Sequence, residues 1–183
     1  MKVALDPDKH AWRPSLLPGQ LVLVSTVSPD GVPNVAPKSW VTMAAFAGPV
    51  VAFGCSDDHL TLRNAEATGE FVLNAVAEPQ AARVWQLPRW HGEERIRRSG
   101  LTLEPARRVR APLVAECPAH LECELDGVRR WGAEALVFGR VVAASIEQEC
   151  LDAPLAEQYA RLGPVFFLED GVYAPLGSPR RVR

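Results

Sequence analysis

The residues best suited to chemistry follow a short apolar segment near residue 55. Residues 55–64 read Cys-Ser-Asp-Asp-His-Leu-Thr-Leu-Arg-Asn, a polar run that leads into a predicted helix. The first N–H groups of a helix have no partner inside it, and the helix dipole favours negative charge there. The segment therefore predicts an anion site of phosphate size. Ordinary capping of the helix by Asp57 or Asp58 is the structural alternative.

The elements around this segment are mostly short strands. An apolar, β-branched run predicts a strand over residues 20–27, and Ser28-Pro29-Asp30-Gly31 predicts a tight turn that leads into a return strand from about 32 to 42. Further strands are expected over 49–54, 71–76, 119–126 and 135–146, the last with a bulge near Gly139, and a closing hairpin over 165–168 and 171–174. Helices are expected over 60–68, ended by Gly69, and over 80–86, 93–98 and 154–162.

Apolar and polar residues alternate without exception over residues 119–126. Ala119, Leu121, Cys123 and Leu125 share one face, and His120, Glu122, Glu124 and Asp126 share the other. This period of two predicts a strand with one buried and one polar, solvent-facing side. Many short strands with a few helices favour a β-barrel with helical additions.

The composition limits the classes of protein. The chain has 183 residues, of which 48% are apolar, so one domain with a sizeable core is expected. The net charge of −2 gives no electrostatic reason to expect nucleic acid as a partner. Apolar runs are too short or too interrupted to span a membrane, and the first twelve residues do not read as a signal peptide, so a cytoplasmic location is expected. The four cysteines form no CxxC pair, which favours reduced thiols and predicts no metal site.

Several blocks of the sequence occur in the order typical of one protein family. They are VSTVSPDGVPNVAPKSW, TLRNAEATGEFVLN, SGLTLEPARRV and PLVAECPAHLECEL. With these blocks the chain resembles the flavin reductase-like, FMN-binding split-barrel family from about Pro18 to Ile146, and more weakly to Ala174. The resemblance implies a β-rich α+β fold, a split β-barrel of the Greek-key type with peripheral helices. It also implies a single domain over residues 1–183, with its core at about 18–174.

The same resemblance implies FMN as the cofactor. The residues expected to bind it are Lys38, Ser39, Trp40, Val41, Thr42, Cys55, Ser56, His59, Thr61 and Asn64. Thr61 and His59 would hold the phosphate, with Arg63 as a further donor, and Asp57 and Asp58 would have to point away from it. Trp40 would stack on the flavin ring, or would instead belong to the core or to a subunit interface. A homodimer is also implied.

One departure from the family concerns the electron donor. Many relatives carry Gly-Asp-His before the long late strand, whereas this chain has Gly132-Ala133-Glu134. The late motif Arg161-Leu162-Gly163 is followed by proline rather than a second glycine. The first hypothesis is an FMN-dependent oxidoreductase that passes electrons from NAD(P)H to an acceptor, such as a monooxygenase or other redox partner. The alternative is an FMN-holding redox protein without an efficient NAD(P)H site of its own, and a third is a domain that binds no flavin.

Overall fold

The computed structural model describes residues 1–8, 12 and 14–180. The strands are β1 (Gly19–Gln20), β2 (Val22–Val27), β3 (Pro33–Lys38), β4 (Val41–Ala45), β5 (Val50–Ser56), β6 (Glu70–Ala75), β7 (Leu103–Glu104), β8 (Leu113–Val114), β9 (Ala119–Trp131), β10 (Glu134–Ile146), β11 (Val165–Glu169) and β12 (Val172–Pro175). The helices are α1 (Leu60–Thr68), α2 (Glu78–Gln86), the short 3-10 helix η2 (Leu87–Arg89), α3 (Gly92–Ser99), α4 (Gln148–Leu151) and α5 (Leu155–Leu162).

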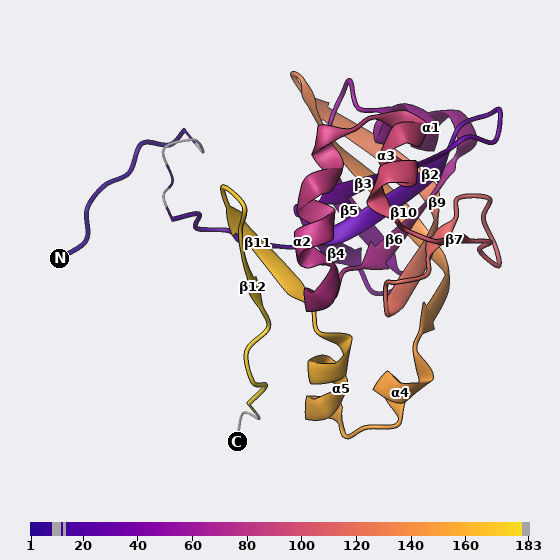
Figure 1. Cartoon of the computed structure of the whole chain (residues 1–183). Helices are drawn as coiled ribbons and strands as arrows, with labels where there is room; N and C mark the ends of the chain where they lie inside the picture. Colours follow the sequence, from indigo (N-terminus) through magenta and orange to yellow (C-terminus); the bar gives the residue numbers. More distant parts are fainter. Residues whose placement is uncertain (9–11, 13, 181–183) are drawn as a thin grey trace.

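The main sheet of the described chain is antiparallel, with the strand order β3-β2-β6-β9-β10-β5-β4 (Figure 1). Its two edge strands, β3 and β4, are consecutive in the sequence and are separated only by Ser39 and Trp40. Two residues cannot span the width of a flat sheet of this size, so the sheet must curl until its edges meet. The fold is therefore the expected β-rich α+β architecture, a split β-barrel of the Greek-key type with peripheral helices.

The prediction of one return strand over residues 32–42 is wrong, because the chain breaks at Ser39 and Trp40 to cross between the two edges. Two glycines allow this crossing. A Cβ at Gly19 would lie 1.5 Å from the backbone oxygen of Ser39, and a Cβ at Gly54 would lie 2.7 Å from Cε3 of Trp40. The Gly54 N–H also donates to the Trp40 carbonyl at 2.7 Å. The crossing therefore depends on close backbone approach from both sides.

Strand β2 is buried on both faces, which explains its continuous apolar sequence. Val22 and Val24 pack into the core that also contains Phe53 and Phe71. Leu23 faces a second core beneath α2 and η2, where it joins Val84. Helix α1 contributes to the first of these cores, so packing fixes its position against the barrel.

Other expectations met different outcomes. The bulge near Gly139 is confirmed as a register shift between Phe138 and Gly139 in the pairing of β10 with β9. The closing hairpin is confirmed as β11 and β12, and α1 spans the predicted residues. The small sheet of β7 and β8 was not predicted. The solvent-facing assignment of Glu122 is wrong, because this side chain is buried. No helix in the described part of the chain is long and apolar enough to cross a membrane.

Candidate functional site

The start of α1 has no side-chain cap. His59 occupies the N-cap position and makes no capping bond through its side chain, so the predicted capping by Asp57 or Asp58 is wrong. Asp57 instead accepts from Arg130 Nε at 2.5 Å, and the same guanidinium donates to Glu66 at 2.7 Å. The free N–H groups of the first turn are therefore available to a ligand.

A chain of buried amides and hydroxyls holds Thr61 at this helix start. Asn34 Nδ2 lies 3.2 Å from Thr61 Oγ1 and 3.3 Å from Thr26 Oγ1. Asn64 Nδ2 donates to the same Thr26 oxygen at 3.2 Å. Because the Thr61 oxygen accepts from Asn34, the Thr61 hydroxyl proton can be donated to a ligand.

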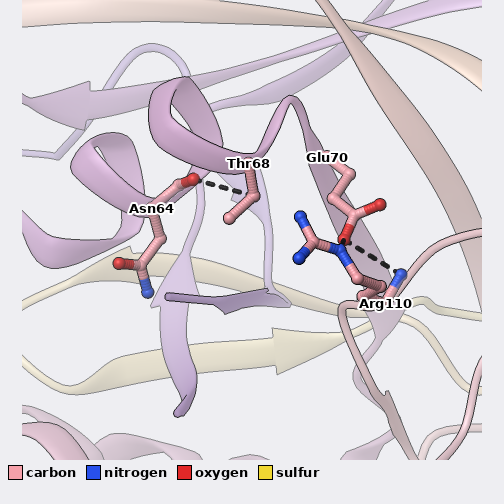
Figure 2. Close-up of polar contacts among 4 residues, drawn as sticks. All are labelled: Asn64, Thr68, Glu70 and Arg110. Carbon is pink, nitrogen blue, oxygen red and sulfur yellow. Dashed lines mark hydrogen bonds and ion pairs between the residues drawn. The ribbon is translucent and has the colours of Figure 1, made fainter. Parts of the chain in front are cut away.

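The far end of α1 is fixed by further polar contacts, which Figure 2 shows. Thr68 Oγ1 donates back to the carbonyl of Asn64 at 2.8 Å. On the next strand, the Glu70 carboxylate accepts from both the backbone N–H and Nε of Arg110, each at 3.0 Å. The Thr68 bond thus lies within the last turn of α1, and the Glu70 contacts link the start of β6 to Arg110.

A basic cavity of about 490 Å³ opens at the start of α1. Its lining includes Asn34, Pro37, Lys38, Asp58, His59, Thr61, Arg63, Pro88, His91 and Arg95. Three of these residues, Lys38, Arg63 and Arg95, carry permanent or near-permanent positive charge. Asp58 is the acidic member of the lining. The cavity is suited to an anion.

Arg95 is the residue that sequence reasoning missed. Its Nε donates to the carbonyls of Leu87 at 3.0 Å and Trp90 at 2.8 Å, and its Nη1 donates to the carbonyl of Val35 at 3.0 Å. The guanidinium is therefore held in place before any ligand arrives. Burial lowers the pKa of Arg95. In the sequence this arginine stands in a run of charged residues over 93–98, and nothing local distinguishes it.

Lys38, Cys55 and His59 form a cluster beside the basic cavity. Lys38 Nζ lies 3.0 Å from His59 Nδ1, and Cys55 Sγ lies 3.7 Å from the same nitrogen. Burial lowers the pKa of Lys38, with partial compensation from Cys55. Burial, assisted by Lys38, also lowers the pKa of His59. If Lys38 donates to Nδ1, His59 is neutral and presents its Nε2–H, so it is a hydrogen-bond donor rather than the expected cation.

A second cavity, of about 190 Å³, lies on the other side of Lys38. Its lining is Pro37, Lys38, Ser39, Trp40, Gly54, Cys55, Ser56, His59 and Glu134. Trp40 is 54% exposed, which excludes the core position that was one alternative for this residue. Glu134 lies on β10 in register with Ser56 of β5, which places it at this cavity. The site is polar and carries one carboxylate.

A third cavity, of about 170 Å³, is apolar and aromatic. Its lining is Leu21, Pro37, Lys38, Ser39, Ala81, Val84, Trp85, Pro88, Phe167, Gly171 and Tyr173. The rings of Trp85 and Phe167 stack with centroids 5.5 Å apart and planes 22° apart. Pro37 and Lys38 line all three cavities, so the three spaces meet at the end of β3.

The structure brings most of the expected site residues together. Lys38, Ser39, Trp40, Cys55, Ser56, His59 and Thr61 line one or more of the three cavities. Val41 packs against the barrel core, and Thr42 is exposed, with its hydroxyl bonded to the Met43 carbonyl. Asn64 lies beneath the site in the network that holds Thr61. Among the described residues, no group of three His, Cys, Asp or Glu side chains is placed to hold a metal ion.

The flavin reductase like domain matches residues 15–163, so the chain belongs to the flavin reductase-like family. An uncharacterized protein of Halalkalibacterium halodurans is 31% identical over 179 residues, which cover 90% of this chain and 84% of the relative.

Solved structures share the fold at lower identity. Nitrilotriacetate monooxygenase component B from Bacillus cereus has a TM-score of 0.87 at 23% identity, covering 100% of this chain and 99% of that one. Flavoredoxin of Desulfovibrio vulgaris has a TM-score of 0.84 at 22% identity, with coverage of 100% and 97%. An FMN-binding protein from Thermus thermophilus has a TM-score of 0.82 at 18% identity, with coverage of 100% of both chains.

Proposed function

We propose that the protein binds FMN and acts as an oxidoreductase that passes electrons through this cofactor. The meeting of three chemically different cavities at Pro37 and Lys38 carries the proposal. FMN also has three parts that diverge from the centre of its ring system: a ribityl phosphate, a polar pyrimidine end and an apolar dimethylbenzene end. Its shape and polarity therefore correspond to those of the site.

Each part of FMN has residues suited to it. The basic cavity would hold the phosphate through Thr61, Arg63, Arg95 and the free N–H groups of α1. The cavity beside Ser39 and Ser56 has the polar groups that a pyrimidine edge requires. A cavity of about 150 Å³ accepts one benzene ring, so the aromatic cavity suits the dimethylbenzene end. Among the three cavities formed here by described residues, one is basic, which favours FMN over FAD, because FAD has a second phosphate and an adenosine.

The bound flavin would supply the electron-transfer chemistry, while the protein would bind it, orient it and tune its electronics. We propose that NADH and NADPH reduce it slowly. Glu134 lines the second cavity, the one suited to the pyrimidine end of the flavin and called the ring-end cavity below. There its carboxylate would oppose the phosphates of a nicotinamide cofactor. This observation supports the alternative function, an FMN-holding redox protein that a partner reduces.

We also propose that the electron acceptor is a separate protein. One structural relative is named as component B of nitrilotriacetate monooxygenase, which supports a role beside another protein component here. The four buried free thiols support a reducing compartment such as the cytoplasm.

We further propose a homodimer that covers the ring end of the site. Trp40 directly before the edge strand β4, Met43 on it and Phe46 directly after it are 54%, 47% and 90% exposed. An exposed apolar edge strand favours pairing with another surface. Sedimentation velocity of the FMN-loaded protein tests this proposal, and a monomer at micromolar concentration would contradict it.

The visible spectrum of the purified protein tests the central proposal. Flavin absorbance with FMN identified by mass spectrometry is expected, either as purified or after incubation with FMN. A protein that stays colourless after incubation would refute it. Adding NADH to the loaded protein without oxygen then separates the two functions, since rapid bleaching indicates a self-sufficient reductase and slow bleaching a protein served by a partner.

A further inference from the structure

We infer that Lys38 is the residue that sets the electron affinity of the bound flavin, because it places a positive charge where the three cavities meet. The inference rests on the proposed FMN site. Reduction adds electron density near flavin N1, and charge at this part of the ring tunes the cofactor. Lys38 is therefore expected to favour the reduced form and to raise the reduction potential of FMN.

The position of Lys38 separates it from the other cations of the site. It is the last residue of β3, directly before the crossing at Ser39. Arg63 and Arg95 line the basic cavity and neither of the other two cavities. The second cavity and the aromatic cavity are the two that would hold the ends of the flavin ring. Among the described residues, Lys38 is the one lysine or arginine that lines either of them. The phosphate cavity thus has two arginines of its own, and Lys38 borders this cavity and both of the other two.

Lys38 shares the basic cavity with Asp58 and the second cavity with Glu134. No carboxylate of the described chain forms an ion pair with it. Its neighbours are the Cys55 thiol and the His59 imidazole, and Arg95 adds a second positive charge nearby. A half-buried ammonium group in such a setting is destabilised until an anion approaches. The reduced flavin ring would provide that anion better than the neutral oxidised ring.

The test compares the affinities of the protein for oxidised FMN and for FMN reduced beforehand without oxygen. Lys38→Met removes the charge at similar volume, and Lys38→Arg keeps it. The ratio of the dissociation constant of oxidised FMN to that of reduced FMN is expected to fall by about tenfold or more in Lys38→Met. This size follows from Coulomb energies at a few ångströms. Each tenfold corresponds to about 30 mV for a two-electron couple. Lys38→Arg should retain most of the ratio.

Arg63→Met is the matched control, because it removes one positive charge from the phosphate end. It should weaken both redox forms by the same factor and leave the reduction potential unchanged. If Lys38→Met behaves in the same way, Lys38 binds only the phosphate and the inference is wrong.

The unmodified protein gives a second test that needs no variant. Its bound FMN should have a higher reduction potential than free FMN, so reduced FMN should bind more tightly than oxidised FMN. The opposite order would overturn the inference even if Lys38→Met fails to fold. Failure to bind either form would instead refute the proposed function.

Discussion

At the scale of single residues, the site depends on side chains whose partners leave one defined group free. Thr61 is buried, and its oxygen accepts from Asn34, so its hydroxyl proton remains available for a ligand. His59 is in a comparable position, because Lys38 engages Nδ1 and leaves Nε2. Arg95 is fixed by backbone carbonyls of η2 and β3. The structure thus pre-orients donors toward one cavity before the anion arrives.

Replacing Thr61 with alanine should weaken FMN binding by about 1.5–3 kcal/mol, the range for a hydrogen bond to a charged group. Fluorescence titration of FMN measures the change. Thr61→Ser keeps the hydroxyl and should retain most of the affinity. An unchanged dissociation constant in Thr61→Ala would move the phosphate to another part of the cavity.

The position of Glu134 bears on how fast NADH would reduce a bound flavin. It lines the ring-end cavity, and the preceding Ala133 accepts from the Asp57 N–H through its carbonyl at 2.8 Å. We expect the double variant Ala133→Asp, Glu134→His to speed reduction of bound FMN by NADH, because it removes the repulsion and adds a hydrogen-bonding pair that can orient the nicotinamide.

Anaerobic stopped-flow spectroscopy of flavin bleaching measures this rate. Glu157→Gln, a change on α5 outside the three cavities, is the control and should leave the rate unchanged. Rapid bleaching in the unmodified protein, or no gain in the double variant, would show that Glu134 does not limit the reaction.

At the scale of elements, buried polar groups on the central strands hold a long irregular segment against the barrel. Glu122 of β9 is 1% exposed, and its carboxylate accepts from the backbone N–H groups of Arg107 at 3.2 Å and Arg108 at 2.6 Å. Asn74 of β6 accepts from the Val114 N–H at 2.9 Å. The part of this strand face around Glu122 is therefore covered by residues 107–108, whereas Glu124 and Asp126 on the same face are exposed.

Replacing Glu122 with glutamine should lower the free energy of unfolding by about 1.5–3 kcal/mol. The carboxylate has two charged acceptor oxygens, whereas the amide has one uncharged acceptor oxygen. Urea unfolding followed by circular dichroism measures the loss. Glu124→Gln is the matched control two residues along the same strand. Glu124 is exposed and pairs with Arg140, so its loss should cost at most about 1 kcal/mol. Equal effects of the two variants would contradict a special role for Glu122.

At the scale of the whole molecule, two histidines link stability to pH. Burial lowers the pKa of His59 and of His120, and Glu104 and Glu122 offset part of the shift at His120. In the unfolded chain both groups should titrate near 6.5. Between the folded and unfolded pKa values the unfolded chain binds more protons. This contribution to stability is therefore complete above pH 6.5 and is lost as the pH falls through the folded pKa values.

The FMN-free protein should accordingly unfold at a lower urea concentration at pH 5.5 than at pH 7.5. His120→Gln should reduce this difference, because it removes one of the two groups. His91→Gln, a change at an exposed position, serves as the control and should leave the pH dependence as it is. If His120→Gln leaves the difference between pH 5.5 and pH 7.5 unchanged, the pH dependence arises from other groups.

The sequence by itself determined the features that depend on neighbours along the chain. The end of α1 follows from Gly69, whose φ of 75° lies in the left-handed region. The turn at Gly31, whose φ is 87°, follows from a local backbone preference in the same way. The family resemblance indicated a cofactor region because its motifs are also local strings.

Only the tertiary structure decided the features that depend on contacts between distant segments. The break at Ser39 exists because Gly19 and Gly54 approach it from two other strands. Arg95 reaches the site through a hydrogen bond to Val35, 60 residues earlier in the sequence. Glu122 is buried by a segment that no periodicity within β9 could reveal. Each of these outcomes depends on which surfaces meet when the sheet curls, and that choice is made by packing across the whole barrel.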